Sequence, residues 1–148
     1  MNKKKMQYVS WGTTVFGALC GLVAFFMIFV TAIKEPLLFD GKFTGLQVAL
    51  GYSVDEYPVF SPSAGIILAF LFPLLGASVA VIGKGYKVVT LIAAATMIVG
   101  GALAFACVSL LNTDIPLGSV SLGAGPIASG VLSLLGSCTL IGSIFVKG

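Results

Sequence analysis

The acidic residues are the first candidates for chemistry, and their spacing does not assemble a reactive site. Asp55 and Glu56 are adjacent, so on a strand they would point to opposite faces and form a poor acid–base pair. Together with Asp40 and Asp114 they offer the oxygen ligands that Ca²⁺ prefers, but no EF-hand spacing is present. We interpret them as solvated loop charges, with weak Ca²⁺ binding as the alternative. We predict no metal site and no cofactor.

The residues needed for common catalytic mechanisms are missing from this chain. It contains no histidine, and all eight of its basic residues are lysine, which removes imidazole ligands, catalytic triads and arginine clamps on phosphate. Serines are numerous, but neither Gly-x-Ser-x-Gly nor Ser-x-x-Lys occurs. Cys20, Cys107 and Cys138 lie in apolar stretches without a CxxC pair, as expected for packing residues. We predict that the protein is not an enzyme.

Small residues at helical spacing form a more informative pattern. Gly17 and Gly21 make a GxxxG pair, and Gly100 and Ala104 repeat that spacing. A longer ridge has a small residue at every fourth position: Gly125, Ser129, Ser133 and Ser137. Because lipid tails give helices no hydrophobic reason to associate, close backbone approach at small residues marks helix–helix contacts. The ridge could therefore pack within one bundle or face a second copy of the chain.

Four apolar segments carry these residues. Of the 148 residues, 58% are hydrophobic and 9% are charged, whereas soluble domains are roughly 25% charged. About 20 apolar residues suffice to cross a bilayer as a helix. We expect a single membrane domain, residues 1–148, whose spans cover approximately residues 11–33, 62–82, 88–111 and 126–146. The outer loops would then be residues 34–61 and 112–125.

The first outer loop is expected to form a small β element. Between residues 43 and 52, Val, Leu, Phe and Tyr stand between glycines, which favours extended chain over helix. Residues 117–122 could add an edge strand from the second loop. The predicted fold class is an all-α membrane protein with four transmembrane helices and a small extracellular β element. An unpaired strand edge invites strand addition by a neighbour, so the loop contributes further candidate association residues: Phe43, Leu46, Val48 and Tyr52.

The lysines predict the orientation of the chain in the membrane. Six of them lie near the termini or in the short loop at Lys84 and Lys87, and two, Lys34 and Lys42, lie in the first outer loop. This bias places both termini in the cytoplasm by the positive-inside rule, and we expect the bacterial cytoplasmic membrane. No ionisable residue lies deep within a span, which argues against proton- or ion-coupled transport by one chain.

The layout of the chain is similar to the claudin-type tetraspan plan. Both have four spans, both termini inside, a first outer loop of extended chain and a shorter second loop. The run from Phe43 to Tyr52 also resembles a segment of small bacterial four-span membrane proteins. Claudins carry paired cysteines and a tryptophan-containing signature in the first loop. Residues 34–61 contain neither residue type, so the resemblance implies an architecture and transfers no residue role.

These features predict a non-enzymatic structural or assembly protein that associates laterally through its outer loop and its small-residue ridges. One alternative is an accessory subunit of a larger membrane transport or secretion complex. Another is a passive channel lined by hydroxyls and backbone carbonyls. The expected partners are the lipid bilayer and copies of the same chain, with other membrane subunits in the accessory case. The net charge of +3, sorted to one side, gives no reason to expect nucleic-acid binding.

Overall fold

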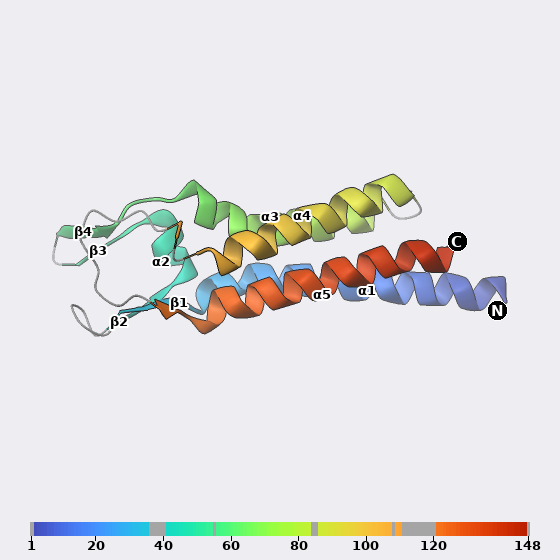
Figure 1. The fold of residues 1–148 in the computed structure, drawn as a ribbon, viewed down its shortest axis with the longest axis horizontal. Helices are drawn as coiled ribbons and strands as arrows, with labels where there is room; N and C mark the ends of the chain where they lie inside the picture. The colour runs from blue at the N-terminus through green and yellow to red at the C-terminus, as the bar shows by residue number, and fades with distance from the viewer. Residues whose placement is uncertain are drawn as a thin grey trace.

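Four long helices run along an elongated molecule, with both chain ends at one end and the strands at the other (Figure 1). The computed structural model describes residues 2–35, 41–54, 56–83, 86–107, 109–110 and 121–147. All four long helices are long and apolar enough to cross a membrane, which confirms the prediction of four spanning segments at that level. They are α1 (Lys3–Phe26), α3 (Ala64–Ile82), α4 (Lys87–Phe105) and α5 (Ala124–Lys147).

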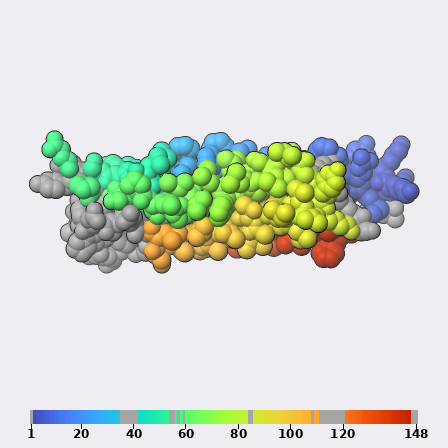
Figure 2. Space-filling view, turned by 90° about the horizontal axis from the view of Figure 1, so that it is seen from above, coloured from blue at the N-terminus to red at the C-terminus, as the bar shows by residue number. Residues whose placement is uncertain are grey.

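The four helices form a ring in the order α1, α3, α4, α5, so each packs mainly against two neighbours. Helices α3 and α4 lie side by side along one face of the molecule (Figure 2). The N-terminal turns of α1 project beyond the ends of α3 and α4 (Figures 1 and 2). The N-terminal turns of α1 are therefore less covered by neighbouring helices than the middle of α1.

The first helix begins and ends earlier than the span expected at residues 11–33. Helix α1 ends at Phe26, a short 3₁₀ helix η1 (Met27–Phe29) follows, and the chain then enters strand β1 (Thr31–Glu35). Strand β1 has a partner on each side, so its backbone groups are satisfied by the sheet. A continuous apolar run does not by itself distinguish a helix from a buried strand. Helix α4 likewise ends before the predicted limit near residue 111.

Two small antiparallel sheets, together with the short helix between β2 and β3 that is described below, form a cap on the bundle. Strands β2 (Gly41–Thr44) and β5 (Ser121–Leu122) flank β1 in the order β2-β1-β5. Strands β3 (Tyr52–Val54) and β4 (Tyr57–Phe60) form a hairpin at the far end of the cap (Figure 1). The predicted small β element is therefore present, and the second loop adds an edge strand through β5. Residues 117–120 of that predicted strand lie outside the described part of the chain.

The middle of the first loop is a helix, where we expected extended chain. Helix α2 (Gly45–Leu50) begins after Thr44, whose side-chain oxygen accepts a hydrogen bond from the Gln47 amide. The Gln47 side chain in turn accepts a hydrogen bond from the Thr44 amide at 2.9 Å. This capping box satisfies two backbone donors that the first turn would otherwise leave unpaired. Its Thr-x-x-Gln signature outweighs the strand propensity of the surrounding residues.

Candidate functional site

The GxxxG pair of α1 is used inside the bundle. A Cβ atom placed on Gly17 would lie 2.9 Å from Cγ of Leu140 in α5. A Cβ atom on Gly21 would lie 2.5 Å from the carbonyl oxygen of Pro73 in α3. The absence of side chains at these two positions thus lets α1 approach two different helices of the same chain closely.

The small-residue ridge of α5 also faces the interior of its own chain. Ser129, Ser133 and Ser137 are at most 1% exposed, and the Ser133 hydroxyl donates to the Ser129 carbonyl at 2.7 Å. A Cβ atom on Gly125 would lie 2.9 Å from the Met27 carbonyl oxygen. Of the two alternatives for this ridge, the arrangement corresponds to packing within one bundle, because the chain's own helices cover the three serines.

A methionine that the sequence did not single out occupies the centre of the bundle. Met97 of α4 is fully buried and contacts a glycine position on each of the other three helices. A Cβ atom added to Gly21 would lie 3.2 Å from the Met97 side chain, and one added to Gly76 or to Gly136 would lie 2.5 Å from it. Met97 therefore fills a hollow that three glycines leave, as suits its flexible side chain. Nothing in the sequence of α4 distinguishes it from other long apolar residues.

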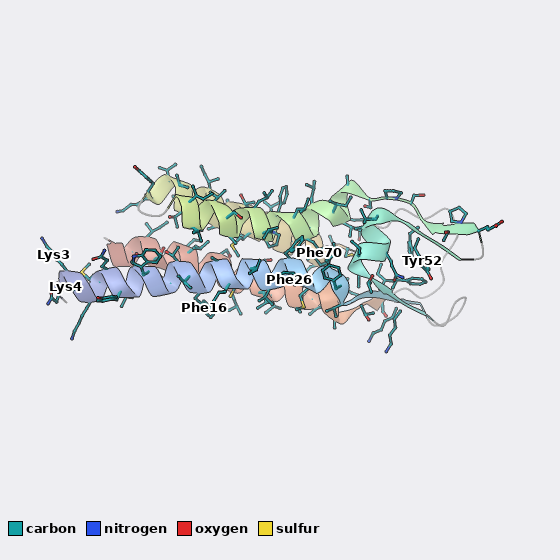
Figure 3. The ribbon with its side chains drawn as sticks, turned by 180° about the vertical axis from the view of Figure 1, so that it is seen from behind. Lys3, Lys4, Phe16, Phe26, Tyr52 and Phe70 are labelled. Carbon is teal, nitrogen blue, oxygen red and sulfur yellow. The ribbon has the colours of Figure 1, made fainter. Side chains whose placement is uncertain are left out.

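The cap and the half of the bundle next to it share one hydrophobic core. Phe43 of β2 packs edge-on against Phe60 of β4, with ring centroids 5.0 Å apart, and against Tyr52 of β3 at 5.6 Å. The same core cluster includes Val48 of α2 and Phe70 of α3, and Phe70 lies where α3 meets the cap (Figure 3). Phe43 and Val48 are therefore core residues of the cap, and Tyr52 packs beside them.

Two leucines of α2 are the apolar residues that this helix leaves uncovered. Leu46 and Leu50 are 36% and 58% exposed, and their spacing places them on one face of the helix. Val48, on the opposite face, and Ala49, on the flank, are buried. A Cβ atom on Gly45, at the start of α2, would lie 3.0 Å from the ring of Phe70. This close packing against α3 fixes the orientation of α2, and with it the direction in which the two leucines point.

The described residues offer little for metal or thiol chemistry. Among them, no group of three or more His, Cys, Asp or Glu side chains could hold a metal ion. Asp40, Asp55 and Asp114, on which weak calcium binding would depend, lie outside the described ranges. Burial raises the pKa of the Cys107 thiol to about 11, so this thiol stays protonated and weakly nucleophilic near neutral pH.

No protein family, curated protein or solved structure matches this chain. The resemblance to a tetraspan layout therefore stays an expectation from the sequence.

Proposed function

We propose that the protein is a non-enzymatic membrane assembly protein that associates laterally with copies of itself through its cap. In this proposal the four helices anchor the chain in a bacterial cytoplasmic membrane, and the cap projects on the outer side. The lysine bias supports this orientation, since Lys3 and Lys4 lie at the end of the molecule opposite to the cap (Figure 3), and Lys5 follows them in the first turn of α1.

The shared core of the cap and the bundle is the observation that carries the proposal. Phe43 and Phe60 from the cap belong to the same buried cluster as Ile66 and Phe70 from α3. A cap held this way has few orientations relative to the helices. It can therefore present a surface to a neighbour without the entropy loss of ordering a flexible loop.

The contact surface that we assign is the exposed face of α2. Leu46 and Leu50 supply its apolar part, and the edge strands β2 and β5 of the three-stranded sheet lie in the same cap. The small residues of α1 and α5 already make contacts within the chain. We therefore assign lateral association to the exposed face of α2 and not to these residues. Of the candidate association residues, Leu46 is the one most available to a partner.

The two alternatives differ in what they require of the molecule. An accessory subunit would use the same face of α2 to bind an unrelated membrane protein. A passive channel has to pass between chains, because Met97 and Leu140 are fully buried within the bundle. The packing of Met97 against three helices thus favours an assembly role over conduction through one chain.

Cysteine crosslinking in native membranes tests the proposal. Leu50→Cys, in a chain whose own three cysteines are replaced by alanine, should form a disulfide-linked dimer on mild oxidation, because symmetric contacts bring equivalent residues together. Phe145→Cys is the matched control, since this residue is 79% exposed near the opposite end of the molecule, and it should stay monomeric. Monomers for both variants, or Leu50→Cys linked to an unrelated protein, would overturn self-association, and the second result would support the accessory subunit.

A further inference from the structure

An apolar groove opens between α1 and α3 in the half of the bundle that is nearer the chain ends. Its volume is about 380 Å³. It is hollow because small residues meet there: Ala77 is buried at its base, and Ala18 and Ser78 replace the large side chains found elsewhere on these helices. The remaining lining residues are branched aliphatic side chains: Leu22, Leu74, Val81 and Ile82.

The face of α1 that lines the groove continues into an aromatic and then a basic residue. Lys4, Trp11 and Ala18 follow one another at intervals of seven residues, close to two helical turns, so they share a face of the helix. Trp11 is 49% exposed and Lys4 is exposed. Tryptophan prefers the membrane interface, and lysine reaches toward the phosphate level with its long apolar stem. The groove thus has an apolar part, an interfacial part and a charged end in that order.

The dimensions of this series match one leaflet of a bilayer. From Leu74 to Ile82 the groove runs about 12 Å along α3, and from Leu22 to Trp11 the face of α1 runs about 16 Å. Half of a typical hydrocarbon core is roughly 15 Å. Lys4 then lies beyond the apolar part, on the N-terminal turns of α1 that project past α3 and α4 (Figure 3). An acyl chain in the groove would therefore bring its headgroup to the lysine-bearing end.

The charge at this end is of one sign. Lys3, Lys4, Lys5 and Lys87 are exposed there. The described acidic residues, Glu35 in β1 and Glu56 between β3 and β4, belong to the cap at the opposite end of the molecule. Each lysine near a membrane surface strengthens attraction to anionic lipid. A zwitterionic headgroup would not complement such a cluster.

We propose that this groove binds a phospholipid of the adjoining leaflet, with an acyl chain between α1 and α3 and an anionic headgroup at the lysines. The site shares no residue with the cap, so its test is independent of the test of lateral association. In this site the small side chains of Ala18 and Ser78 leave room for the acyl chain. Trp11 lies at the membrane interface, and Lys4 favours a negatively charged headgroup.

The single tryptophan of the chain reports on this site in the unaltered protein. The protein is reconstituted in phosphatidylcholine vesicles that contain a small fraction of brominated phosphatidylglycerol, or the same fraction of brominated phosphatidylcholine. Bromine quenches tryptophan on contact, so preferential binding makes the anionic lipid quench Trp11 at a lower mole fraction. Lys4→Gln should reduce this preference about fivefold, the effect of one lysine at a membrane surface. Equal quenching by the two lipids in the unaltered protein would overturn the proposal.

A pair of variants tests whether the groove itself holds the lipid. Ser78→Phe fills the groove, and Cys138→Phe places the same bulk on an exposed position of α5. After detergent extraction, native mass spectrometry should find one retained phosphatidylglycerol in the unaltered protein and in Cys138→Phe, and none in Ser78→Phe. Retention of the lipid by folded Ser78→Phe would overturn the assignment. So would a lipid-free dimer of the unaltered protein that Ser78→Phe converts to monomer, because a second copy would then occupy the groove. If Ser78→Phe fails to fold, the quenching of Trp11 decides.

Discussion

Glycine positions decide how closely the helices of this chain approach. Gly21 and Gly12 belong to the same helix, yet a Cβ atom on Gly21 would lie 2.5 Å from the Pro73 carbonyl oxygen, and nothing lies within 4 Å of one on Gly12. The contrast gives a matched pair of substitutions. It also separates the glycines that pack from those that merely occur in an apolar sequence.

Gly21→Ala should destabilise the protein by about 1–3 kcal/mol, because the added methyl group forces α1 away from α3. Gly12→Ala should be neutral or stabilise the helix by up to about 1 kcal/mol, because alanine has the higher helix propensity. Reversible unfolding of the detergent-solubilised protein measures both free energies. Similar losses in the two variants would contradict the packing described here.

At the residue scale, the sequence predicts which residues make helix contacts better than it predicts their partners. The spacing of Gly17, Gly21 and the serine ridge correctly marks close contacts, since small residues have few other uses in a span. Whether such a contact lies within one chain depends on how helices distant in sequence are arranged, and spacing carries no such information. Met97 shows the limit clearly, because its site is made by glycines on three other helices.

At the scale of elements, the length of an apolar run did not fix where α1 ends. The run continues through Ile33, but Ile33 pairs with Phe43 on one side and Leu122 on the other as part of β1. Leu122 is distant in sequence and Phe43 is ten residues away, so the propensity of residues 27–33 alone could not reveal either partner. Helix α2 is a different case, because Thr44 and Gln47 form a local capping box that is visible in the sequence. The prediction of extended chain gave the strand propensity of the surrounding residues too much weight.

Thr44→Val should loosen α2 without unfolding the bundle. Loss of the cap costs about 1 kcal/mol, which corresponds to a roughly fivefold larger population of the open helix. Hydrogen exchange of the Val48 and Ala49 amides measures this opening. Ser53→Ala, at an exposed position of β3, is the control and should leave the same amides unchanged. Unchanged exchange in Thr44→Val would show that tertiary contacts alone hold α2.

At the scale of the whole molecule, the cap and the chain ends lie at opposite ends of the bundle (Figure 1), so one labelling experiment determines the orientation. In a cysteine-free chain, Glu56→Cys should react with a membrane-impermeant maleimide in intact cells. Lys87→Cys should react only after the membrane is permeabilised, because the positive-inside rule puts this lysine in the cytoplasm. Both residues are exposed, so access to the thiol is matched, and the reverse result would invert the proposed topology.

The core that joins the cap to α3 also couples the cap to the bilayer. Helices adjust to a thicker or thinner hydrocarbon layer chiefly by tilting. Phe70 lies within the same buried cluster as Phe43 and Phe60, so a tilt of α3 displaces the two cap strands with it. In the assembly proposed above, the direction in which Leu46 and Leu50 face a neighbour would then follow membrane thickness, and lipid composition would influence association.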